Sequence, residues 1–337
     1  MNAVVAAIAF HLPEATLNND ALAEQFPEWS VEKIERKTGI CHRHIAAPDE
    51  CASDLAEHAA RNLFQAHPDM AERIDYLLLC TQSPDFFLPT TACLLQQRLG
   101  LPNTVGALDI NLGCSGFVYG LGLAKGLIES GQAEGVLLIT AETYSKFIHP
   151  EDKSVRTIFG DGAAATFIQA RDDDGNSRLP GIGPFVFGTD GRGGPHLIVK
   201  QGGLRRSNKG MTASGNREYG AGHLYMNGAE VFRFTLQAVP ASVISVLNKA
   251  GKGMDEIDLF VFHQANRYML EHLRKKIGIP EEKFVVDLQH CANTVSASIP
   301  IALKRAEAAG RLTPGMRVMV AGFGVGYSWS AALLNWQ

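Results

Sequence analysis

Apolar runs of strand length alternate with longer amphipathic stretches along the first half of the chain. The pattern predicts strands over 76–80, 105–110 and 135–140, and helices over 91–99 and 114–130. Buried strands that alternate with helices are typical of an α/β protein with a mostly parallel sheet. We therefore expect an α/β fold whose first sheet is covered by helices.

The second half of the chain repeats this pattern once. The matching segments are 74–82 with 257–264, 108–110 with 286–288, and 136–139 with 318–321. The offsets are all close to half the chain length, whereas a solenoid has far shorter repeats. We predict two similar halves, 1–172 and 173–337.

The duplication brings three residues to equivalent places. Cys114 and Asn293 each follow a strand and precede a helix, and His263 ends the strand that matches 76–80. Ligands of open α/β sheets gather outside the carboxyl ends of strands. We expect these three side chains to converge there.

The segment 181–228 between the halves is rich in glycine and polar residues. A long irregular segment inside a compact protein is usually functional or disordered. We interpret it as a flap over a channel. Its glycines lack the strand and helix context of a nucleotide-binding loop.

Composition excludes several classes of function. The 337 residues are 46% hydrophobic with a net charge of -4, and no basic stripe suggests a nucleic-acid partner. The first ten residues lack the basic start of a signal peptide and predict a strand, and no apolar stretch reaches membrane-spanning length. Six cysteines are scattered without a CxxC pair, which indicates reduced thiols in the cytoplasm.

Cys114 carries the clearest chemical signal. It precedes a helix, whose N-terminal dipole favours a thiolate, and Gly113 and Gly116 let a thioester approach the backbone. Taken alone, His263 would be interpreted as a buried core histidine and Asn293 as a helix cap. Together with Cys114 they supply the partners of a nucleophilic cysteine.

Four motifs give the chain a family resemblance. The motifs 113–116 (GCSG), 263–266 (HQAN), 293–294 (NT) and 322–326 (GFGVG) resemble the β-ketoacyl-acyl-carrier-protein synthase III family of thiolase-fold condensing enzymes. The resemblance implies a duplicated five-layered αβαβα fold with two mixed sheets, and a homodimer. It also implies decarboxylative Claisen condensation of an acyl thioester, on coenzyme A or acyl-carrier protein, with malonyl-acyl-carrier protein. The product is a 3-oxoacyl thioester for fatty acid initiation or a dedicated acyl pathway.

The resemblance also implies roles for individual residues. Cys114 carries the acyl group, His263 and Asn293 donate hydrogen bonds to the enolate, and no metal or cofactor takes part. The backbone N–H groups of Cys114 and of the turn formed by Gly324, Val325 and Gly326 stabilise the second oxyanion. The substrate-binding residues it implies are Leu88, Phe232, Arg233, Asn266, Phe323 and Lys37.

The chain departs from the family pattern at several of these positions. Lys33 and Lys37 stand where a tryptophan and an arginine hold adenine, Leu88 replaces a phenylalanine that closes the partner's acyl pocket, and Val325 replaces a glycine. If position 325 needs a positive φ, the oxyanion turn is altered. A basic patch for the acidic carrier protein would include Arg205, Arg206, Lys209 and Arg233.

Other functions remain open at this stage. A plant-type (type III) polyketide synthase shares the cysteine, histidine and asparagine, although such chains are usually longer. A thioester hydrolase would release free acid without a condensed product. A papain-like protease is disfavoured by the residues around the cysteine, and a silent subunit by the presence of all three chemical groups.

Overall fold

The computed structural model describes residues 1–171, 181–204, 219–220 and 222–337. Its first large sheet has the strand order β1-β7-β6-β4-β5. The strands are β1 (Asn2–His11), β4 (Tyr76–Cys80), β5 (Gly106–Ile110), β6 (Gly135–Glu142) and β7 (Gly162–Arg171). β4 is parallel to β5 and β6, whereas β7 is antiparallel to β1 and β6, so the sheet is mixed. The predicted strands 76–80, 105–110 and 135–140 are confirmed.

The second large sheet has the strand order β11-β12-β13-β8. The strands are β8 (Ile182–Thr189), β11 (Leu259–Phe262), β12 (Arg317–Gly324) and β13 (Ser328–Asn335). β11 and β12 are parallel, and the other pairs are antiparallel. Two small sheets pair β2 (Thr16–Asn18) with β3 (His42–His44), and β9 (Leu197–Val199) with β10 (Leu224–Met226).

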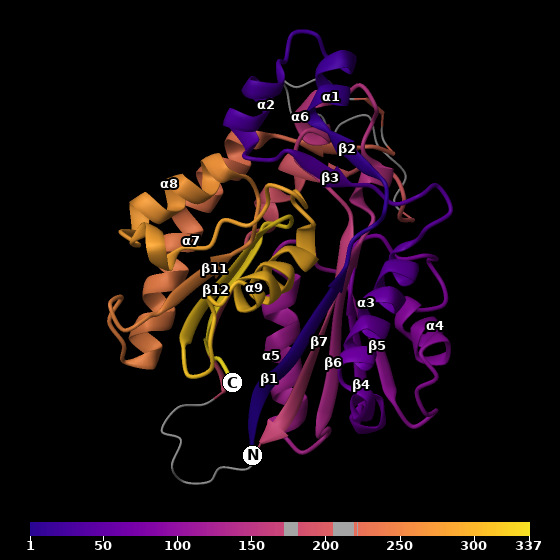
Figure 1. Cartoon of the computed structure of the whole chain (residues 1–337), viewed down its shortest axis with the longest axis vertical. Helices are drawn as coiled ribbons and strands as arrows, with labels where there is room; N and C mark the ends of the chain where they lie inside the picture. The colour runs from indigo at the N-terminus through magenta and orange to yellow at the C-terminus, as the bar shows by residue number, and fades with distance from the viewer. Residues whose placement is uncertain (172–180, 205–218, 221) are drawn as a thin grey trace.

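Helices separate and cover the two large sheets (Figure 1). α5 (Gly116–Glu129) and α9 (Ser298–Ala308) lie between them, and their apolar side chains share one core cluster with strands of both sheets. α3 (Ala52–Ala66) and α4 (Thr91–Arg98) cover the outer face of the first sheet, and α7 (Gly228–Ala250) and α8 (Arg267–Ile277) cover the second. This arrangement has the five predicted layers. The remaining helices are α1 (Asn19–Gln25), α2 (Val31–Thr38) and α6 (Lys153–Arg156).

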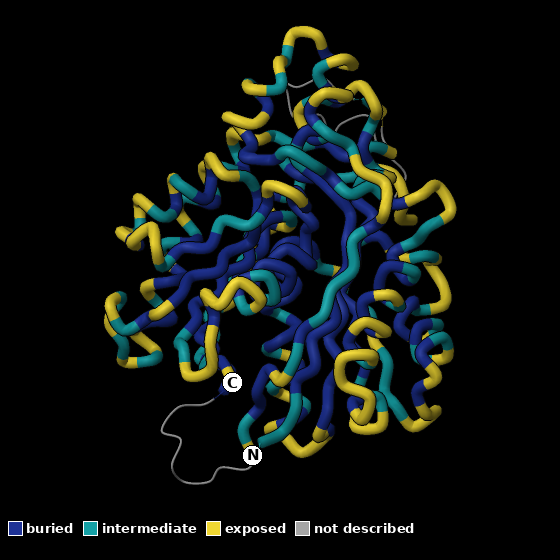
Figure 2. Tube along the Cα trace, viewed as in Figure 1, coloured by how far each residue is buried: buried dark blue, intermediate teal, exposed yellow. Residues whose placement is uncertain are grey.

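Burial follows the layers. The inner strands and α9 are buried along most of their length, whereas β1, β5 and β8 are less buried. Exposure concentrates in the outer helices and loops (Figure 2). β6 is buried at every position, as expected for a strand with helices on both faces. Gly120 lets α5 lie close to this strand, because a Cβ at this position would collide with Leu138.

α7 corrects the expectation that no stretch reaches membrane-spanning length. It is the one described helix that is long and apolar enough, by length and composition, to cross a bilayer. In the structure it packs on β8, β12 and β13 and on α8, and Val239, Val243 and Val246 are buried in the core. Its apolar residues are thus accounted for by packing on the second sheet.

The interpretation of 181–228 as an irregular flap is wrong for much of its described part. Residues 182–189 form β8, which pairs with β13, and β9 and β10 follow. The glycines were misleading because two of them make room for rings: a Cβ at Gly188 would strike Trp329, and one at Gly193 would strike Tyr327. Residues 205–218 lie outside the described residues.

Two further expectations concern the repeat. Residues 286–288 were expected to form a strand, but they form none. The nearest pairing is an isolated bridge between Phe284 and Phe260. Val285 donates one backbone hydrogen bond to Phe260, and the chain then turns toward Asn293. The predicted division at 172/173 falls at residues outside the described part, so it stays a prediction.

Candidate active site

Cys114 lies in the short connection between β5 and α5. Its residue is 5% exposed, and the next residue, Ser115, caps α5. The Ser115 hydroxyl bonds to the Ser328 hydroxyl at 2.6 Å, and Ser330 donates to the Ser115 carbonyl at 3.3 Å. Both partners belong to β13, so the second sheet fixes the corner that carries the cysteine.

The Cys114 thiol is not a resting thiolate, contrary to the sequence expectation. Burial, and then the nearby Glu142 carboxylate, raise its pKa to about 12. The backbone N–H groups of Val325 and of Cys114 itself act in the opposite direction, because they face the sulfur. Desolvation raises the pKa by more than these donors lower it. The sequence shows that Cys114 precedes a helix, but it does not show how deeply the thiol is buried.

The end of β12 packs directly on Cys114. A Cβ at Gly324 would lie 2.8 Å from both Cβ and Sγ of Cys114, so glycine is required for this approach. Val325 does not have a positive φ; the left-handed backbone is at Gly326, with φ 138°. Valine at position 325 therefore keeps a backbone N–H beside Cys114 without an unfavourable φ.

His263 directly follows β11 and is 2% exposed. Its Nδ1 lies 2.7 Å from the Ser298 hydroxyl, which leaves Nε2 for the cavity. Burial lowers the pKa of the imidazole to about 3, so the ring is neutral at physiological pH.

Asn293 lies in a strained turn. The φ angles of Ala292 and Val295 are 62° and 53°, and a positive φ is an outlier for a β-branched residue such as valine. The Asn293 Oδ1 accepts from the Val295 N–H at 2.9 Å, so the side-chain NH₂ is left to donate. The Asn293 backbone bonds to Ile158 and Gly160, both from the first half of the chain.

A cavity of about 340 Å³ joins these groups. Cys114, His263 and Asn293 all line it, which confirms the expected convergence but does not test their catalytic roles. Of the predicted substrate-binding residues, Phe232, Asn266 and Phe323 line the cavity, and so does Gly324 of the predicted oxyanion turn. The other walls include Ile158, Phe159, Leu197, Met226, Val231, Tyr268 and Met269. The lining is mostly apolar, which suits an acyl chain or a pantetheine arm.

Three predicted substrate-binding residues lie elsewhere. Arg233 points from α7 into an ion pair with Glu230 at 2.7 Å and does not line the cavity. The Lys37 ammonium lies 5.0 Å from the centre of the Trp29 ring, next to that of Lys33 at 5.4 Å. Two ammonium groups thus lie near the Trp29 ring. Arg205, Arg206 and Lys209 of the predicted basic patch lie outside the described residues.

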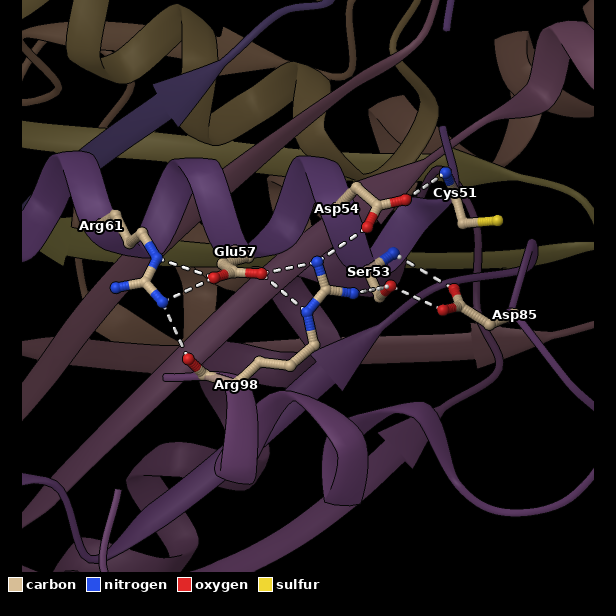
Figure 3. A network of polar contacts seen from close by, with 7 residues as sticks. All are labelled: Cys51, Ser53, Asp54, Glu57, Arg61, Asp85 and Arg98. Atoms are coloured by element: carbon tan, nitrogen blue, oxygen red, sulfur yellow. Dashed lines mark hydrogen bonds and ion pairs between the residues drawn. The ribbon is translucent and has the colours of Figure 1, made fainter. Parts of the chain in front are cut away.

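Leu88 stands at the tip of an exposed loop. Phe86, Phe87 and Leu88 are 59%, 80% and 86% exposed. The loop behind them is rigidly attached: Asp85 accepts from the Ser53 N–H and hydroxyl, and Arg98 joins Ser53 to Asp54 and Glu57 (Figure 3). An apolar tip on a fixed base is typical of a protein contact.

Glu142 is a site residue that the sequence analysis missed. It ends β6, is fully buried, and accepts from the Gln82 N–H at 3.0 Å, the Ser83 hydroxyl at 3.3 Å and the Ser296 hydroxyl at 2.8 Å. Burial raises its pKa to about 8. A glutamate at the end of the apolar run 135–141 was the available signal, because such a carboxylate must have buried partners.

No group of three or more potential metal ligands occurs among the described residues. The expectation that neither metal nor cofactor takes part stays a prediction.

Known proteins that resemble this chain belong to the family that the sequence motifs indicated. Residues 108–191 match the family 3-oxoacyl-[acyl-carrier-protein (ACP)] synthase III, and residues 247–336 match its C-terminal family. A β-ketoacyl-[acyl-carrier-protein] synthase III of Clostridium perfringens is 38% identical over 99% of both chains. This chain belongs to the β-ketoacyl-acyl-carrier-protein synthase III family. It is a condensing acyltransferase by family, as predicted.

Solved structures of family members share the whole fold. A crystal structure of a 3-oxoacyl-(acyl-carrier-protein) synthase III is 55% identical, with a TM-score of 0.95 and complete coverage of both chains. The β-ketoacyl-[acyl carrier protein] synthase III of Thermus thermophilus is 36% identical, with a TM-score of 0.89 over 99% of both chains. The prediction of a thiolase-like fold with two mixed sheets is confirmed.

Proposed function

We propose that this enzyme condenses an acyl thioester with malonyl-acyl-carrier protein and releases carbon dioxide, giving a 3-oxoacyl thioester that starts a fatty acid or a dedicated acyl chain. The observation that carries the proposal is the apolar cavity in which a cysteine thiol meets two neutral hydrogen-bond donors. The family membership supports the same chemistry.

The first half-reaction transfers the acyl group to Cys114. The sulfur forms a bond to the acyl carbon, the bond to the departing thiol breaks, and the proton of Cys114 leaves with that thiol. The Val325 and Cys114 N–H groups, which face Sγ, are placed to stabilise the tetrahedral oxyanion. Because the pKa of the thiol is high, these donors matter more than a preformed thiolate.

The second half-reaction forms the carbon–carbon bond. Loss of carbon dioxide from the malonyl group leaves an enolate, whose carbon attacks the acyl carbon on Cys114 and displaces the sulfur. Asn293 Nδ2 and a neutral imidazole N–H of His263 are suited to hold the enolate oxygen, since neither readily gives up its proton. Both donors reach the same cavity as the sulfur.

The substrate would enter along α7 and α8. Phe232, Asn266 and Tyr268 line the cavity on the side of these helices. The half-buried Lys33 and the exposed Lys37, both near Trp29, lie on α2, which contacts α8. We propose that these cations face the phosphate groups of coenzyme A or the acidic surface of the carrier protein, in place of an adenine clamp.

We also propose that the enzyme works as a cytoplasmic homodimer. The exposed tip formed by Phe86, Phe87 and Leu88 supports a partner contact, and so does Leu108, which is 44% exposed on the edge strand β5. The six cysteines form no disulfide, in keeping with a reducing compartment.

Intact-mass analysis tests the proposed function. Incubation with a panel of acyl thioesters should add one acyl mass to the wild type and none to Cys114→Ala. Addition of malonyl-acyl-carrier protein should then discharge the acyl group as a 3-oxoacyl product. Release of free acid alone would identify a thioester hydrolase, and repeated extension would identify a polyketide-type synthase.

A further inference from the structure

The Ser298 hydroxyl can donate its hydrogen either to the imidazole of His263 or to a backbone carbonyl. Nδ1 lies 2.7 Å from the Ser298 hydroxyl oxygen. The same oxygen lies 2.9 Å from the Val295 carbonyl and receives the Gln264 N–H at 3.3 Å. A serine hydroxyl has one hydrogen to donate, so it serves either Nδ1 or the Val295 carbonyl.

The choice decides which ring nitrogen carries the proton. If Ser298 donates to Nδ1, the proton of the neutral ring is on Nε2, which faces the cavity. If Ser298 donates to Val295, Nδ1 must carry the proton and Nε2 has only a lone pair. Only the first arrangement lets His263 donate to an enolate oxygen.

We propose that Ser298 is a positioning residue that donates to Nδ1 of His263 and thereby keeps the proton on Nε2 during decarboxylation. The inference rests on the proposed function and names how one of its donors is prepared. The Gln264 N–H donates to the Ser298 oxygen at 3.3 Å, and Nδ1 of His263 is the nearer of the two acceptors for the hydroxyl hydrogen, at 2.7 Å against 2.9 Å. Ser298 begins α9 and is 3% exposed, so its position is fixed and water does not compete.

The variant Ser298→Ala separates the two half-reactions. Without the hydroxyl, the Val295 carbonyl is the remaining acceptor beside the ring, and it requires the proton on Nδ1. Nε2 then has no hydrogen for the enolate. We expect decarboxylation of malonyl-acyl-carrier protein to fall about 100-fold, the typical effect of losing one such donor. Acyl transfer to Cys114, followed by intact mass, should change less than about threefold.

Ser296 provides a matched control two residues away in the same turn. It is also a buried serine, but its hydroxyl donates to Glu142 and not to His263. Ser296→Ala should therefore not lower decarboxylation relative to acyl transfer, whatever it does to acyl transfer through Glu142. Ser298→Thr retains a hydroxyl and should restore most of the decarboxylation. Equal loss of both half-reactions in Ser298→Ala would overturn the proposal, because it would indicate a merely structural role.

A measurement on the wild type avoids dependence on variant folding. Long-range ¹H–¹⁵N spectra of the histidine rings, assigned with His263→Gln, report which nitrogen is protonated. We expect a protonated Nε2 at His263, and a protonated Nδ1 would overturn the inference. Failure of the wild type to acylate Cys114 would instead refute the proposed function, so the two failures are distinguishable.

Discussion

At the scale of single residues, the site keeps its ionisable groups neutral. Burial raises the pKa of Cys114 and of Glu142 and lowers that of His263, so none of the three is predominantly charged near pH 7. The sequence identified Cys114, His263 and Asn293 because their motifs are specific. It misjudged the charge of the thiol, because desolvation depends on packing from the second sheet.

The high pKa of Cys114 predicts its reactivity. Alkylation by iodoacetamide requires the thiolate, so its rate should rise about tenfold per pH unit between pH 7 and pH 10. The measurement is loss of acyl-transfer competence against pH, with site-specific mass analysis of Cys114. A plateau near pH 8 would show that the thiol is more acidic than its surroundings indicate.

Glu142 should make folding stability depend on pH. Its pKa is about 4.5 in the unfolded chain and about 8 when folded, so the folded state binds the extra proton in between. The wild type should therefore lose stability relative to Glu142→Gln as pH rises from 5 to 8, by up to about 1.4 kcal/mol per pH unit. Urea unfolding of both proteins at each pH measures this difference. A difference that is constant with pH would contradict it.

At the scale of elements, the sequence predicted regular segments better than connections. The strand at 76–80 and the helix at 91–98 follow from uninterrupted apolar patterns. The segment 286–288 has a strand-like pattern but forms no ladder, since the chain there turns to deliver Asn293. β8 was hidden by its glycines, although one of them, Gly188, makes room for the Trp329 ring of β13.

Gly324, the last residue of β12, allows a steric test of the site. Gly324→Ala would place a methyl group 2.8 Å from Cβ and Sγ of Cys114. We expect acyl transfer to fall at least tenfold, with a loss of about 1–3 kcal/mol in stability from overpacking. Intact-mass kinetics and urea unfolding measure the two effects.

Gly126 provides the control for this substitution. It lies within α5, and a Cβ there would meet no atom within 4 Å. Gly126→Ala should keep full acyl transfer and gain about 0.5–1 kcal/mol from the helix propensity of alanine. Similar acylation rates in the two variants would argue against contact between Gly324 and the nucleophile.

At the scale of the whole molecule, the duplicated pattern predicted the architecture, and one exposed tip predicts the assembly. The two-sheet, five-layer arrangement could be anticipated because strand and helix periodicities recur at half the chain length. The cavity could not, since its walls come from α7, α8, β9, β10, β12 and the connections that carry Cys114, Phe159, His263 and Asn293.

The exposed tip predicts a loss of dimerisation on charge insertion. Leu88→Asp should shift the mass in light scattering from dimer toward monomer, because burial of a carboxylate in an apolar contact is costly. Leu204→Asp is the control, since Leu204 is also an exposed leucine and belongs to a different segment of the chain. An unchanged mass for Leu88→Asp would exclude the tip as a dimer contact.

Asn293 is held by backbone bonds to Ile158 and Gly160, and its turn is tied through Ser296 to Glu142. During synthesis, the segment that carries Cys114 leaves the ribosome long before His263 and Asn293 do. We expect a nascent chain that ends before residue 290 to be catalytically silent, however well its early strands have folded. Catalytic activity should therefore appear only after the last strands have packed.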